Sequence, residues 1–178
     1  GASGTVGGAD VLMEYLARVG VNVGDELDGL VITHAHEDHY GGLPAIAANY
    51  DVRRYVDPGF DAGSVGFQQA RAAAEGVVFA GGGEVHIPAA PQLTALHGST
   101  DLFGDNMTAF LVWAASTPPD GSATSPSNTD VNNTSIVFSL FWAGRRVLLM
   151  GDAEEAVESA LLDAAASGSV VISADVLK

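Results

Sequence analysis

Three histidines and two carboxylates stand within six positions of this chain: His34, His36, Glu37, Asp38 and His39. A short apolar and β-branched run precedes them, and two glycines follow. Neutral imidazole is a common protein ligand of zinc, and carboxylates balance the charge of divalent cations. Because three of the chain's 5 histidines lie in this run, the cluster predicts a metal site rather than a solvated surface turn.

The spacing of the cluster is suited to two neighbouring cations. His34 and His36 can converge on one cation if the backbone turns between them, because they are two residues apart after a strand. Asp38 and His39 follow that turn and can face a second cation, which a carboxylate can help to bridge. The chain contains no cysteine, so only nitrogen and oxygen ligands are available.

The elements that must position this cluster alternate between helix and strand, which predicts one α/β domain with mixed sheets over residues 1–178. The polar stretch at 116–133 predicts a long surface loop, and residues 77–96 predict short strands. Apolar periodicity predicts helices at 9–19, 43–49, 64–75 and 153–166, and strands at 30–33, 51–56, 108–113, 135–142, 145–150 and 170–178.

The charge balance restricts the partners. Lys and Arg number 7 against 22 Asp and Glu, which gives a net charge of -15. A basic face for nucleic acid is therefore disfavoured, although bound divalent cations can supply local positive charge. No apolar run has the length of a membrane span, so we expect a soluble protein. The bacterial cytoplasm and the exterior both stay open as compartments, as does the oligomeric state.

Two motifs carry a resemblance to a known family. Residues 33–43 resemble the His-x-His-x-Asp-His signature of the metallo-β-lactamase superfamily, and residues 147–152 resemble its later strand that ends in a metal-bridging aspartate. Residues 132–138 are similar to one branch, the hydrolase domain at the C-terminus of bacterial competence (DNA-uptake channel) proteins and its free-standing relatives. The resemblance implies an αββα sandwich of mixed sheets flanked by helices, without the family's N-terminal hairpin and C-terminal end.

The resemblance also implies a role for each ligand. His34 and His36 would hold the first metal, Asp38 and His39 the second, and Asp152 would bridge both. Asp152 taken alone would be interpreted as a helix N-cap. A water or hydroxide between the metals would be the nucleophile, and Asp38 would be the catalytic residue that orients it. Two divalent ions are expected, with zinc first and manganese or iron as alternatives.

The chain departs from the family where many members carry a third histidine for the first metal. That place holds Asp130, Asn132 and Asn133, and the competence-type branch also shows asparagines there. We expect these three residues to line the site. His97 is an alternative ligand, although it comes earlier in the chain than the motif order requires.

The expected activity is hydrolysis by a metal-bound water, with a phosphodiester as the first substrate class because the competence-type resemblance implies it. A small-molecule acyl substrate, namely a lactone, a thioester or a β-lactam, is the alternative, and the net charge of -15 favours it slightly. A family member that keeps the fold and a metal site without catalysis is the third hypothesis.

Overall fold

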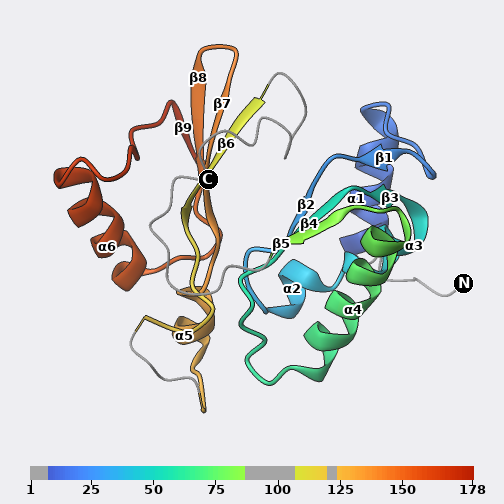
Figure 1. The fold of residues 1–178 in the computed structure, drawn as a ribbon, viewed down its shortest axis with the longest axis horizontal. Helices are drawn as coiled ribbons and strands as arrows, with labels where there is room; N and C mark the ends of the chain where they lie inside the picture. The colour runs from blue at the N-terminus through green and yellow to red at the C-terminus, as the bar shows by residue number, and fades with distance from the viewer. Residues whose placement is uncertain (1–7, 87–106, 120–123) are drawn as a thin grey trace, which may run out of the picture.

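The computed structural model describes residues 8–86, 107–119 and 124–178, and within them the elements form four layers. Helices α3 and α4 cover one group of strands, α1 lies against α3, and α6 covers the other group (Figure 1). The strand groups face each other across a buried apolar core. This arrangement confirms the predicted αββα sandwich of mixed sheets.

The first half of the molecule is built on parallel strands. Strand β1 pairs with β3 as a short ribbon, and strands β2, β4 and β5 form the first sheet, in the order β2-β4-β5. Parallel strands need crossover connections, which the helices provide. The elements are α1 (Gly8–Arg18), β1 (Glu26–Leu27), β2 (Leu30–Val31), α2 (Glu37–Tyr40), α3 (Leu43–Asn49), β3 (Asp51–Val52), β4 (Arg54–Val56), α4 (Val65–Ala80) and β5 (Glu84–His86).

The second half is built on the second sheet, which is mostly antiparallel and has the order β6-β7-β8-β9. The central pair β7–β8 is the predicted hairpin, turning at Ala143 and Gly144, both of which have positive φ. Strand β9 adds to β8 in parallel. The elements are β6 (Met107–Trp113), α5 (Asn128–Asn132), β7 (Val137–Trp142), β8 (Arg145–Leu149), α6 (Glu155–Ala166) and β9 (Val176–Leu177).

Three apolar clusters hold the layers together, because burying apolar surface is the main favourable contribution to folding. The outer clusters pack helices α3 and α4 on the first strands and helix α6 on the second sheet. The middle cluster lies between the sheets, where Val56 meets Leu111 and Ile136. A backbone hydrogen bond from Ile136 N to Thr33 O, 2.9 Å long, joins the halves at the start of β7.

Several predicted boundaries were wrong in the first half. Helix α4 continues to Ala80, past the predicted end at 75, so the strand prediction fails for residues 77–80. Valines favour strands in isolation, but burial of Val78 against the first sheet overrides that preference. The predicted strand at 51–56 divides at Arg53, because β3 pairs with β1 whereas β4 pairs with β2 and β5.

The second half also differs from the prediction at two places. Helix α5 lies inside the predicted 116–133 loop, and a capping box between Ser127 and Asp130 begins it. The predicted strand at 170–178 is a strand only at β9. Before it, Val170 and Ile172 pack against the core under α6 instead of pairing with a neighbour.

Among the described residues, no helix combines the length and the apolar character that crossing a bilayer requires.

Candidate metal centre

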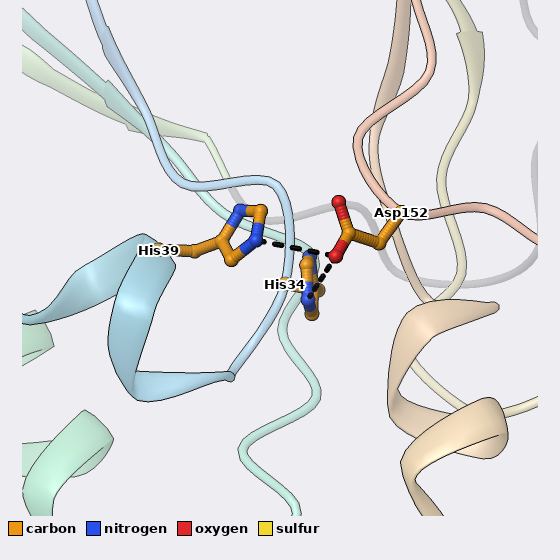
Figure 2. A group of neighbouring side chains, drawn as sticks. All are labelled: His34, His39 and Asp152. Carbon is orange, nitrogen blue, oxygen red and sulfur yellow. Dashed lines mark ion pairs between the residues drawn. The ribbon is translucent and has the colours of Figure 1, made fainter.

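The predicted ligands come from two segments that face each other across the join between the halves. His34 follows strand β2, His36 is the N-cap residue of α2, and His39 lies in the last turn of that short helix. Asp152 comes from the opposite half, in the turn that follows β8. Figure 2 shows its carboxylate pointing between the rings of His34 and His39. Helix α2 was not predicted, yet it is what turns His39 towards Asp152.

Three of the side chains present ligand atoms to one point. Oδ2 of Asp152 lies 3.3 Å from Nε2 of His39 and 3.9 Å from Nε2 of His34. One ligand atom from each residue lies within 4.8 Å of the other two. The rings of His34 and His39 are 4.1 Å apart between centroids. His34, His39 and Asp152 could therefore hold a metal ion together.

The two remaining predicted ligands lie at the edge of this group. Nδ1 of His36 is 3.0 Å from Nε2 of His34, so these two ring nitrogens are direct neighbours. Oδ2 of Asp38 is 3.7 Å from Nε2 of His39, but the Asp38 side chain is 83% exposed. Both residues border the cluster on the side of α2. His36 contacts His34 directly, whereas the Asp38 side chain lies mostly in solvent.

The electrostatics of the centre keep His34 neutral. Its side chain is fully buried, and burial is the main cause that lowers its pKa to about 4. Positive charge on His39 and His36 lowers the pKa further, and the carboxylates of Asp152 and Asp38 oppose the shift. A neutral imidazole keeps a lone pair for a metal at neutral pH, since only the unprotonated nitrogen can be a ligand.

The donor chemistry fits a divalent cation. Two imidazole nitrogens and a carboxylate oxygen are the ligand types that zinc takes in sites without cysteine. Among the described residues, Asp152 forms ion pairs with His34 and His39 and with no Lys or Arg. A bound cation would supply a fixed positive charge to this set.

Two of the residues expected to line the site, Asn132 and Asn133, hold the loop that carries Asp152, and a third, Asp130, caps helix α5. Nδ2 of Asn132 donates to Oε1 of Glu154 at 2.6 Å, and the Glu154 N–H donates to Oδ1 of Asn133 at 2.9 Å. Asp130 accepts from Ser127 N at 2.7 Å in the capping box of α5. Oδ1 of Asn132 is buried without a hydrogen-bond partner. The fourth expected residue, His97, lies outside the described residues.

Three residues of the site carried no predicted role. The hydroxyl groups of Thr33 and Ser135 lie beside Nδ1 of His34, at 3.1 and 3.3 Å. Gly151 has a φ of +60°, and a Cβ there would come within 2.8 Å of Ser135 Oγ. The only sequence signal was their position, directly beside the motifs that carry the ligands.

A cleft of about 770 Å³ opens beside the centre, between the first turns of α1 and helix α2. Leu12 lies on one wall, and Glu37 and Asp38 lie on the other. His39 reaches both the cleft and the ligand cluster. A substrate in this cleft would therefore lie against the centre and beside two carboxylates.

Comparison with known families agrees with this geometry. The family model described as the metallo-beta-lactamase superfamily matches residues 3–176. The chain belongs to the metallo-β-lactamase superfamily, whose members are typically metal-dependent hydrolases. A search of curated proteins found no match.

Proposed function

We propose that this chain is a hydrolase that uses two divalent cations, zinc first and manganese or iron as alternatives. The observation that carries the proposal is the convergence of Nε2 of His34, Nε2 of His39 and Oδ2 of Asp152 from opposite halves of one domain. Two imidazole nitrogens and a carboxylate oxygen that converge without a Lys or Arg among them are suited to hold a cation at their centre.

The proposed ligand sets follow the two-residue spacing of the motif. His34 and His36 would hold the first cation, and the 3.0 Å separation of their facing nitrogens supports a shared ligand. Asp38 and His39 would hold the second, and Asp152 would bridge. When bound, the cations would supply a nucleophile by lowering the pKa of a coordinated water, and would polarise the bond that breaks. Asp38, at the open side of the centre, would orient that water.

We propose a phosphodiester as the substrate class, on the resemblance of residues 132–138 to the competence-protein branch. Two close cations suit phosphoryl transfer because they can stabilise the attacking and the leaving oxygens together. In this proposal Asn132 and Asn133 fix the loop of Asp152 through Glu154, which keeps the bridging carboxylate in place.

An acyl substrate is the second candidate, and the cleft favours it. The charged side chains that line the described cleft are Glu37 and Asp38 beside His39, so a polyanion would meet negative charge there. A neutral lactone, thioester or β-lactam would not, and its apolar part could contact Leu12. The net charge of -15 acts in the same direction at longer range.

The test is hydrolysis by protein stripped with a chelator and reloaded with zinc or manganese. Bis(4-nitrophenyl) phosphate and single-stranded DNA report phosphodiesterase activity, and a lactone, a thioester and a β-lactam report acyl transfer. We expect metal-dependent turnover of the phosphodiesters that Asp152→Asn abolishes. Asp163→Asn, an equal change of charge on α6, should retain it.

Each other outcome selects an alternative. Turnover of acyl substrates alone would replace the phosphodiester with the second candidate. Tight metal binding without turnover of any of these substrates would favour the third hypothesis, a metal-binding fold without catalysis. Turnover that is equal in stripped and reloaded protein would contradict the metal-dependent mechanism itself.

A further inference from the structure

Two hydroxyl groups contact the ring nitrogens of the ligand cluster that do not face the Asp152 carboxylate. Thr33 Oγ1 is 3.1 Å from Nδ1 of His34 and 3.3 Å from Nδ1 of His39. Ser135 Oγ is 3.3 Å from Nδ1 of His34, and this serine is fully buried. Each hydroxyl therefore contacts the ring nitrogen that does not face Asp152.

The hydrogen-bonding capacity of these groups allows both rings to donate to the hydroxyl oxygens. A hydroxyl oxygen can accept two hydrogen bonds, and a neutral imidazole carries its proton on one nitrogen. Ser135 Oγ already accepts the Asp152 N–H at 3.1 Å, and it retains one acceptor position for His34. Thr33 Oγ1 lies within reach of both rings and can accept from each. A proton on Nδ1 satisfies these acceptors and leaves the lone pair on Nε2.

We propose that Thr33 and Ser135 are positioning residues that hold His34 and His39 as their Nδ1–H tautomers, so that both Nε2 lone pairs face the cation. Ser135 at the same time fixes the backbone of Asp152. This inference rests on the proposed metal centre and names the groups that prepare it. The nitrogen that binds a metal is set by the hydrogen bond that the other nitrogen makes.

The backbone holds the two hydroxyls in place independently of any ligand. The 2.9 Å hydrogen bond from Ile136 N to Thr33 O ties the two residues' segments together. Gly151 packs so closely that an added Cβ would lie 2.9 Å from Ser135 Cβ and 3.0 Å from Thr33 Cβ. Glycine is required there by both its positive φ and this contact. The two hydroxyls are thus part of the packed join between the halves.

The proposal separates hydroxyl chemistry from packing through paired variants. Thr33→Val removes the hydroxyl at nearly constant shape, and Thr33→Ser keeps it. Ser135→Ala removes the second hydroxyl, and Ser139→Ala is its matched control. Ser139 is a buried serine of β7 that accepts a hydrogen bond from Arg146 and makes no contact with the centre.

The first measurement is zinc affinity of the full chain, by competition with a chelator of known affinity. Loss of an outer hydrogen bond to a metal-ligating histidine typically weakens binding by about 10–100-fold. We expect that loss for Thr33→Val and Ser135→Ala. Thr33→Ser and Ser139→Ala should stay close to the unsubstituted protein.

The second measurement is the tautomer itself, from long-range proton–nitrogen NMR correlations of the imidazole rings in metal-free protein. The unsubstituted chain should show His34 and His39 protonated on Nδ1, and Thr33→Val should move proton population to Nε2. A merely structural role would not change this signature. If Ser135→Ala does not fold, the Thr33 pair decides alone, since valine preserves the shape of the side chain.

The outcomes separate this inference from the metal centre. An unsubstituted chain that does not bind zinc contradicts the proposed function. A chain that binds zinc, with all four variants equal in affinity and with Nε2–H rings, leaves the centre intact and overturns the role of the hydroxyls.

Discussion

The ion pair of Asp57 and Arg71 and the cluster of His34, His39 and Asp152 are both groups of ionisable side chains, but only the first contains a permanently charged cation, the Arg71 guanidinium. Arg71 donates to both carboxylate oxygens of Asp57 at 2.7 Å, and the Gly59 N–H adds a third hydrogen bond at 2.6 Å. Every strong acceptor there has a donor, so the pair is complete within the protein.

The cluster of His34, His39 and Asp152 has a different character. Its ligand atoms are two imidazole nitrogens and a carboxylate oxygen that converge without a Lys or Arg among them. Burial lowers the pKa of His34 to about 4, so this imidazole brings no positive charge to Asp152 at neutral pH. The Asp57–Arg71 pair is complete within the protein, whereas the histidine cluster is a group that could hold a cation.

The largest effect on stability should come from breaking the Asp57–Arg71 pair. Asp57 is fully buried and Arg71 is 16% exposed, so Arg71→Met leaves a buried carboxylate without its partner. We expect the free energy of unfolding to fall by about 3–5 kcal/mol in urea titrations. Zinc affinity of the folded fraction should not change, because the pair does not contact the centre.

The double variant Asp57→Asn/Arg71→Met is the control for this pair. It removes the stranded charge as well, so much of the lost stability should return. The Asp57 carboxylate also acts on a buried neighbour: burial, together with this negative charge, raises the pKa of Tyr55. If the single variant is as stable as the unsubstituted chain, the contrast with the metal centre does not hold.

The next effect is the pH dependence of the metal-free protein. The pKa of His34 is about 4 in the fold against its ordinary value of 6.5. Above pH 6.5 the imidazole is neutral in both states; as the pH falls from 6.5 to 4, the unfolded chain binds a proton that the folded chain does not. The contribution of His34 to the free energy of unfolding should therefore decrease over this window by on the order of 3 kcal/mol and stay constant below pH 4.

His34→Gln isolates this contribution, because the other titrating groups stay in place. Chemical denaturation in the presence of a chelator, at steps across the window, gives the difference between the two proteins. An equal pH slope for both would show that His34 is not held neutral by the fold.

A smaller effect should come from the glycine that joins Asp152 to the two hydroxyls. Gly151→Ala places a Cβ within 2.8 Å of Ser135 Oγ at a positive φ. We expect a loss of about 2 kcal/mol of stability from strain and crowding, together with weaker zinc binding. Gly168→Ala is the matched control, because it has a φ of +77° and open space around the added Cβ. It should cost about 1 kcal/mol and leave zinc binding unchanged.

The smallest effect should come from an exposed ion pair. Arg18 and Glu14 pair across one turn of α1, and their side chains are 73% and 63% exposed. Arg18→Ala should change the free energy of unfolding by less than about 0.5 kcal/mol, since solvent and salt screen such pairs. A larger change would mean that exposure does not separate the two classes of ion pair in this protein.

The sequence predicted the elements whose signals are local. Helix α3 has the predicted bounds, because Gly42 precedes it and Pro44 occupies its first turn. The hairpin of β7 and β8 was predicted from two apolar runs around Gly144. His34, His39 and Asp152 were predicted as ligands from residue type and order, and the fold brings them together.

The missed features depend on contacts between distant segments. The end of α4 is set by burial of Val78 against the first sheet, which its neighbours in the chain do not reveal. Helix α5 was hidden by its polar composition, although Ser127 and Asp130 have the spacing of a capping box. The contact of Ser135 with His34 spans 101 residues of chain, so no local pattern could predict it.

The most direct test of the central claim is the zinc content of the purified chain after equilibrium dialysis, measured by elemental analysis. The unsubstituted protein and Asp163→Asn should each retain about two zinc ions per chain. Asp152→Asn, which removes the carboxylate between the imidazoles, should retain less. Fewer than about one ion per chain in the unsubstituted protein, or equal content in all three, would contradict a metal centre built on His34, His39 and Asp152.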